Sequence, residues 1–190
     1  IFACTSSFSQ MAPSTVAGPN SSGLVKDVNH RFELDCPGPS IFPFALRLFK
    51  NSFWGILKKG DWNNENTDEV FEPIINFLVN HKDQYIFDFH DLMSEFLYEL
   101  DRKEIYEHSI NQEQFNEEDF LNQRAYVLTN GNKYYHDIIS LIKPLDGELK
   151  CPQLLTLPAK AWSIKNNKSI EKYPHTPKYN IQAKSNTKYW

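Results

Sequence analysis

The apolar positions between residues 85 and 142 recur with the period of an α-helix. Across residues 85–100 the large apolar side chains fall on one stripe, whereas Asp91, Ser94 and Glu95 fall off it. The members of the stripe are Phe89, Leu92, Met93, Phe96, Leu97 and Leu100. Because such spacing places side chains on one face of a helix, the segment predicts an amphipathic helix whose stripe faces a core.

A second pair of helices follows in the pattern. Asn116 precedes three acidic residues; its side chain can cap a helix, and the acids favour the positive end of the helix dipole. Asn130 and Gly131 can close that helix, since either residue tolerates the left-handed conformation. We expect Asn132 to cap the next helix. The expected core residues are Phe120, Leu121, Ala125, Val127 and Leu128, then Tyr135, Ile138, Ile139 and Ile142.

Two shorter helices are expected before residue 85. The first begins at Asn51 or Ser52 and ends at Gly60. The second ends near His81 and begins at Thr67 or at Pro73, because proline is tolerated in a first helical turn.

These patterns predict a mainly α protein: a small helical bundle with irregular segments on both sides. Residues 1–23 resemble a flexible arm, and residues 24–48 an extended lead-in that can hold one short strand. Residues 49–144 form the helical domain. We expect residues 145–190 to be a mostly irregular coil tail that docks on the bundle through Leu154, Leu155, Leu157, Ala161 and Trp162.

Composition narrows the classes of partner and location. The 190 residues carry a net charge of −4 with a pI of about 5.9, which argues against nucleic-acid binding. No run approaches the roughly 20 apolar residues that span a bilayer, so no transmembrane segment is expected. We favour a cytoplasmic location. An exported lipoprotein stays open, because residues 1–4 look like the end of a lipoprotein signal with the lipid on Cys4, although Phe2 is bulky for that pattern.

Cysteine spacing and glycine content argue against several chemistries. Cys4, Cys36 and Cys151 match no zinc pattern, which favours free thiols and leaves a Cys36–Cys151 bridge open for an exported protein. With 7 glycines in the chain, no Gly-rich loop precedes a helix to cradle a phosphate. No nucleophile elbow is present. We therefore expect no cofactor and assign no catalytic residue.

One group of acids has helical ligand spacing. Asp88, Asp91 and Glu95 recur at three and four residues, so that they could bind a divalent cation. A solvated acidic face is the interpretation that we favour, and no metal is expected.

Several phrases together resemble a known family. They are residues 53–57 (Phe-Trp-Gly-Ile-Leu), residues 96–101, Phe120-Leu121 leading to Arg124, and Asn130-Gly131 followed by Tyr134-Tyr135. In order and spacing they resemble the family known as domain of unknown function 4240, over about residues 53–144 with weaker similarity to residue 190. The resemblance implies a small, mainly helical, mostly bacterial domain and implies no activity.

The polar members of these phrases are the candidate ligand-binding residues: Tyr98, Asp101, Arg124, Asn130 and Tyr134. In the interpretation that we favour, Asp101 pairs with Arg124 to tie two helices together. In the other, Arg124 and the tyrosines form a small polar pocket for an anion. Aromatic residues in polar segments either anchor a partner or fold back on the core, and the sequence leaves both open; they are Trp62, Tyr106, Tyr173, Tyr179, Tyr189 and Trp190.

The functional expectation is a non-catalytic protein-binding module, adaptor or immunity-like, that uses an acidic helical face. Its partner is expected to be another protein. The alternative is an enzyme or small-ligand binder with a polar pocket around Arg124.

Overall fold

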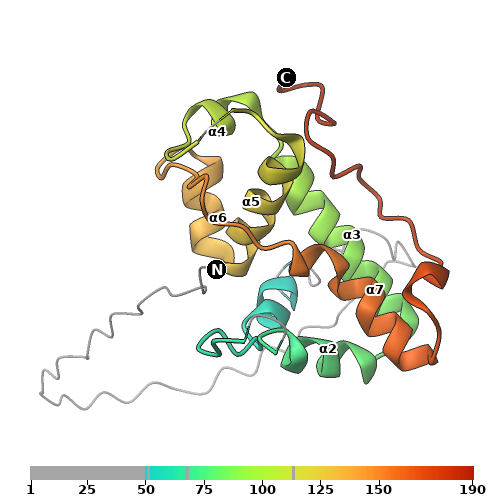
Figure 1. Cartoon of the computed structure of the whole chain (residues 1–190). Coiled ribbons are helices and arrows are strands. Elements are labelled where there is room, and N and C mark those ends of the chain that lie inside the picture. Colours follow the sequence, from blue (N-terminus) through green and yellow to red (C-terminus); the bar gives the residue numbers. More distant parts are fainter. Residues whose placement is uncertain (1–49, 51, 67–68, 113) are drawn as a thin grey trace, which may run out of the picture.

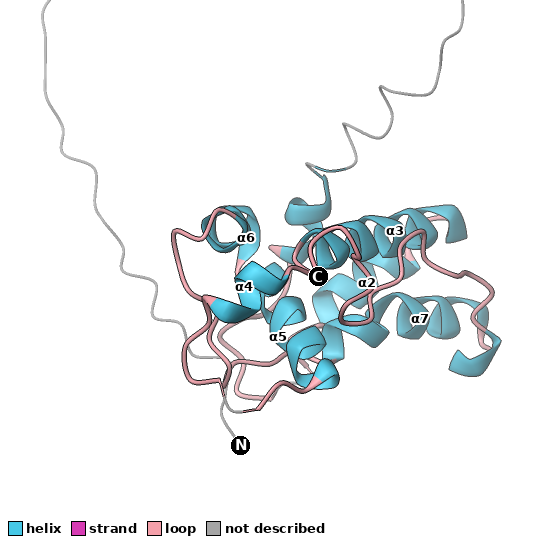
Figure 2. Cartoon of the chain, turned by 90° about the horizontal axis from the view of Figure 1, so that it is seen from above, coloured by secondary structure: helices cyan, strands magenta, loops and turns pink. Residues whose placement is uncertain are grey.

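The computed structural model describes residue 50 and residues 52–66, 69–112 and 114–190. It is mainly α, as predicted, and holds no strand within these residues, where an isolated bridge pairs Ile110 with Asp146 (Figure 2). The expected arm, the lead-in strand, Cys4 and Cys36 lie outside the described residues. Cys151 is buried.

Six α-helices with defined bounds and one short 3-10 helix follow a helical stretch at residues 52–57 (Figure 1). They are α2 (Glu72–Val79), α3 (Asp83–Glu99), α4 (Lys103–Glu107), α5 (Glu117–Thr129), α6 (Gly131–Ile139), α7 (Gln153–Asn166) and η1 (Ile170–Lys172). The helix expected near Pro73 thus begins at Glu72, with the proline in its first turn.

Helix α3 lies at the centre of the bundle. It packs against α5 and α7, while α7 also covers α2 and α5 also covers α6. The stripe predicted for α3 is confirmed, because Phe89, Met93 and Leu97 are fully buried. Burial of such side chains supplies most of the helix's stability, since an isolated helix of this length is marginal in water.

An aromatic cluster fixes residues 52–57 against α3. The Phe53 ring lies 5.0 Å from the rings of both Phe89 and Phe96, and Trp54 contacts Phe96 and Tyr135. Aromatic pairs at such distances add to the stabilisation from burial alone. The phrase at residues 53–57 therefore contributes to the core.

The N-terminal ends of α5 and α6 confirm one predicted cap and correct another. The Asn116 side chain accepts hydrogen bonds from the backbone N–H groups of Glu118 and Asp119, as the sequence predicts. Gly131 has φ of +85°, and Asn130 flanks both helices. The expectation that Asn132 caps α6 was wrong, because the glycine's left-handed conformation lets α6 begin at Gly131 without a loop.

Two further expectations were wrong. Residues 153–166 are a helix, where irregular chain was expected. Pro158 inside α7 costs about 3 kcal/mol, but burial of Leu154, Leu157 and Trp162 outweighs that cost at about 1.5–3 kcal/mol for each large side chain. Ile142 is 72% exposed, because α6 ends at Ile139 before its stripe reaches that position.

The other part of the expectation for residues 145–190, a coil tail that docks on the bundle, is confirmed beyond α7. Beyond α7, apart from η1, residues 167–190 are irregular and docked on the bundle.

Among the described residues, no helix combines the length and hydropathy that crossing a bilayer requires.

We predict that Phe89→Ala lowers the free energy of unfolding by about 3–5 kcal/mol, because it leaves a cavity at the centre of α3. Urea denaturation followed by circular dichroism measures this change. The matched control, Ile142→Ala at an exposed position, should change stability by less than about 0.5 kcal/mol. Equal effects of the two substitutions would contradict the assignment of α3 as the central helix.

Candidate functional site

Arg124 is fully buried on the inner face of α5 and bridges three parts of the chain. Its Nη1 donates to the Leu97 carbonyl oxygen at 2.8 Å, and its Nη2 donates to the Ile181 carbonyl oxygen at 2.9 Å. Its Nε makes a longer contact, 3.4 Å, with the Phe120 carbonyl oxygen. The planar guanidinium thereby joins α3, α5 and the segment near residue 181.

Asp101 follows the end of α3 and is the fully buried counter-charge. Its carboxylate lies 3.9 Å from Arg124 Nη1 and accepts closer hydrogen bonds from four other donors. These donors are the backbone N–H groups of Lys184 (3.0 Å) and Asn186 (2.9 Å), Ser185 Oγ (3.2 Å) and Trp190 Nε1 (2.9 Å). Hydrogen bonds to a charged group are the stronger kind, so the carboxylate binds residues 184–190 tightly.

We call residues 173–190 the docked segment. Figure 1 shows it running from the end of α7 back along α3 toward α4. The ring of Tyr179 stacks on that of Tyr98 at 5.1 Å, and Asn186 Nδ2 donates to the Tyr98 carbonyl oxygen at 2.9 Å. The pairing of Asp101 with Arg124 therefore ties more than two helices, because it also holds this segment.

Burial sets the electrostatics of Arg124. Desolvation lowers the pKa of Arg124 to about 10, and the nearby Asp101 carboxylate opposes that shift. The guanidinium therefore remains charged at neutral pH. A buried charge of this kind needs several partners to offset its desolvation, and the three carbonyl oxygens together with Asp101 provide them.

The acids along α3 already have partners within the chain. Asp91 Oδ1 lies 2.9 Å from His175 Nε2 and accepts the backbone N–H of Lys178 at 2.8 Å. Glu95 pairs with Lys50, and Glu99 accepts a hydrogen bond from the Tyr135 hydroxyl. The expected acidic face of α3 is therefore covered largely by the protein itself.

The acids of this helix do not form a ligand set. Gln84 donates to Asp88 at 2.8 Å, so each of Asp88, Asp91 and Glu95 is engaged with a different group. In the part of the chain that the structure describes, no three His, Cys, Asp or Glu side chains are placed to hold one metal ion.

Two of the five candidate residues lie apart from Arg124. The Asn130 amide donates to the Tyr126 carbonyl oxygen at the junction of α5 and α6. The Tyr134 ring lies 5.3 Å from Lys143 Nζ, and burial, aided by Asp146, raises the pKa of the Tyr134 hydroxyl. The structure thus brings together Tyr98, Asp101 and Arg124. Asn130 lies at the start of α6 and Tyr134 within it.

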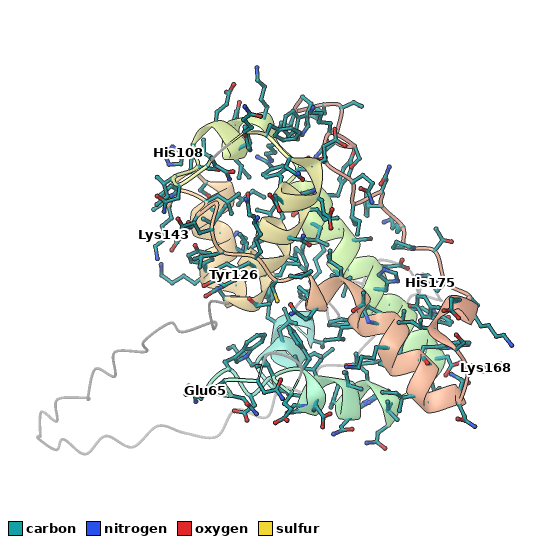
Figure 3. The ribbon with its side chains drawn as sticks, in the orientation of Figure 1. Glu65, His108, Tyr126, Lys143, Lys168 and His175 are labelled. Atoms are coloured by element: carbon teal, nitrogen blue, oxygen red, sulfur yellow. The ribbon has the colours of Figure 1, made fainter. Side chains whose placement is uncertain are left out.

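A histidine pair holds the start of the docked segment. His90 Nδ1 lies 3.2 Å from the Tyr173 hydroxyl, and the His90 and His175 rings are 5.7 Å apart. Figure 3 labels His175 close to the point where the segment leaves η1. Burial, with the neighbouring His175, lowers the pKa of His90 to about 4, and Asp91 opposes the shift. His90 is therefore neutral at neutral pH.

The aromatic side chains in polar segments fold back on the core. Trp62 Nε1 donates to the Leu57 carbonyl oxygen at 3.1 Å, and its ring contacts Phe71. Tyr106 contacts Phe115 and Phe120, and the ring of Trp190 packs against the same two phenylalanines. Of the two uses left open by the sequence, these contacts favour closing the core.

A small cavity lies away from Arg124. It has a volume of about 80 Å³ between α2 and α7 and is lined by Phe71, Ile75, Gln153, Thr156, Leu157 and Lys160. At Arg124 each side-chain nitrogen donates to the chain itself, which leaves the guanidinium poorly placed to bind an external anion.

Sequence reasoning missed four residues that complete the centre, which are Ile181, Lys184, Ser185 and Asn186, and named Trp190 only as an aromatic residue that could fold back. They lie more than 50 positions from their partners, and irregular chain has no periodicity that reveals its contacts. The one hint was aromatic residues at the end of a polar tail.

Fold and site together define a small, mainly α domain whose own C-terminal segment covers a buried charge pair. The model of the family described as "Protein of unknown function (DUF4240)" matches residues 49–162, more than half of the chain. The protein therefore belongs to this family. Comparisons with curated proteins and with solved structures each found no match.

We predict that Arg124→Met lowers the free energy of unfolding by about 3–5 kcal/mol, because it strands the buried Asp101 charge and three carbonyl oxygens. Urea denaturation at neutral pH measures the loss. Lys103→Met is the control, since Lys103 forms an exposed pair with Glu107 worth about 0.5 kcal/mol or less. A loss below about 1 kcal/mol for Arg124→Met would contradict the role given to this residue.

We also predict a pH-dependent difference between the protein and its His90→Gln variant. Below pH 6.5 the unfolded chain protonates His90, whereas the folded chain resists protonation until about pH 4. As pH falls from 6.5 to about 4, the free energy of unfolding of the unsubstituted protein should fall by about 2 kcal/mol relative to that of the variant. This value is reduced to allow for the screening of His90 by solvent. Urea denaturation at several pH values measures the difference. The same pH dependence in both proteins would contradict the burial of His90 in the folded state.

Proposed function

We propose that the domain is a non-catalytic protein-binding module, adaptor or immunity-like, that uses an acidic surface to bind a basic protein partner. The single observation that carries the proposal is an uncompensated acidic segment beside α2. We favour it over an enzyme or small-ligand binder because the polar groups around Arg124 are engaged in holding the fold.

Residues 61–72 contain five acids and no lysine or arginine. Asp61, Glu65, Glu69 and Glu72 are exposed, and none of them joins an ion pair among the residues that the structure describes. Figure 3 shows Glu65 at the edge of the molecule. Unpaired charges of one sign attract a partner of the opposite sign and speed its association.

The acids on α3 are less suited to this task. Asp91 and Glu95 of α3 are partly buried, and Asp101, which follows the helix, is fully buried. All three have internal partners, so a partner protein would have to displace those contacts first. We therefore place the acidic surface at residues 61–72 and the start of α2.

The cavity between α2 and α7 adjoins this surface through Phe71. Its apolar lining of Phe71, Ile75 and Leu157 can receive one small apolar side chain of the partner. Interfaces commonly combine such a central anchor with a charged rim. The proposed partner surface therefore carries lysine or arginine side chains around one apolar residue.

The test is an affinity capture from a lysate of the source organism at low and high salt, using the full chain. We expect one basic protein to be retained at low salt and to be lost when Glu65 and Glu72 are both changed to Lys, with at least a tenfold drop in affinity. The matched control is the double variant Glu104→Lys and Glu148→Lys, which alters exposed acids elsewhere. Retention of the same protein by both double variants, or of none by the unvaried chain, would refute the proposal.

A further inference from the structure

The C-terminal end of α7 and η1 expose two isoleucines. Ile164 in α7 is 54% exposed, and Ile170 in η1 is 41% exposed. Asn167, with φ of +49°, reverses the chain between them, and the backbone N–H of Lys168 donates to the Ser163 carbonyl oxygen at 3.1 Å. The turn is therefore held in one conformation with both isoleucines outside the core.

Lysines flank these isoleucines in the sequence. Residues 160–178 contain five lysines and one acid, in a chain whose net charge is −4. Lys160, Lys168 and Lys172 are exposed, whereas Lys165 is paired with Asp83. We call Lys160, Ile164, Lys168, Ile170 and Lys172 the lysine–isoleucine tip.

Helix geometry places part of the tip on one face. Lys160 and Ile164 are four residues apart on α7, so that they share one side of the helix. Lys168 lies beyond the helix, after the reversal at Asn167. Ala161 and Trp162 of α7 are buried, whereas Lys160 and Ile164 are exposed. The exposed side chains of the tip are thus left outside the core of the bundle.

Exposed aliphatic side chains flanked by exposed lysines match the chemistry of an anionic lipid surface. Lysines are attracted to acidic headgroups, and isoleucines gain by entering the boundary with the acyl chains. A protein partner fits less well, because lysine is depleted at protein interfaces, where arginine and aromatic residues are enriched. We propose that the lysine–isoleucine tip docks the domain on an anionic lipid bilayer.

This inference differs from the proposed function in its partner and in all its residues but Lys160, which also lines the cavity between α2 and α7. Figure 3 shows Lys168 and Glu65 at well-separated edges of the molecule. An anionic bilayer that attracts the tip also repels the acidic segment at residues 61–72. Docking through the tip therefore leaves that segment directed away from the bilayer and accessible.

The test is sedimentation of the full chain with vesicles of phosphatidylcholine alone or with about 30% phosphatidylserine, at about 0.1 M salt. We expect binding to the anionic vesicles only, with a marked fall at higher salt. The double variant Lys168→Glu and Lys172→Glu should lower the partition coefficient by at least about 25-fold, at roughly fivefold for each lysine. Ile164→Asp should lower it about tenfold.

Ile142→Asp is the matched control, because Ile142 is a more exposed isoleucine outside the tip. It should bind the anionic vesicles as the unvaried chain does, and circular dichroism should show all variants folded. Three outcomes would overturn the proposal: no binding to anionic vesicles, an equal loss with Ile142→Asp, or a loss with the lysine variant but none with Ile164→Asp. The last outcome would show that the lysines bind headgroups alone, without the isoleucine that the proposal requires.

Discussion

The rest of the structure depends on the need to satisfy one buried carboxylate, that of Asp101. An isolated charge in a protein interior is prohibitively costly, so the fold must deliver donors to it. Arg124 supplies the opposite charge at 3.9 Å, but the nearer donors come from Lys184, Ser185, Asn186 and Trp190. Residues 184–190 are ordered although they are irregular, because the buried carboxylate needs their hydrogen-bond donors.

This constraint also explains which surface remains for a partner. His175 and Lys178 of the docked segment contact Asp91. The acids of α3 that look available in the sequence therefore already have partners within the molecule. Negative charge without a compensating base is left at residues 61–72, and positive charge gathers around the end of α7. The separation of the two charges gives the domain two different surfaces, on which the two proposals rest.

Local patterns predicted α3 and α5 because an amphipathic stripe and an Asn116 cap are determined by nearby residues. The buried pair of Asp101 and Arg124 could also be proposed, since two opposite charges flank apolar helices. Helix α7 was missed because Pro158 interrupts its pattern and tertiary burial overrides that preference. The docked segment's contacts could not be predicted, because hydrogen bonds across more than 80 residues leave no periodic trace in irregular chain.

Native-state hydrogen exchange at the backbone amides of Lys184 and Asn186 tests the central claim most directly. Both N–H groups donate to the Asp101 carboxylate, at 3.0 and 2.9 Å. If the carboxylate organises the fold, both amides should exchange only through openings whose free energy approaches that of global unfolding, as core amides of α3 do. Exchange at the rate of an unstructured peptide, with α3 still protected, would contradict the account.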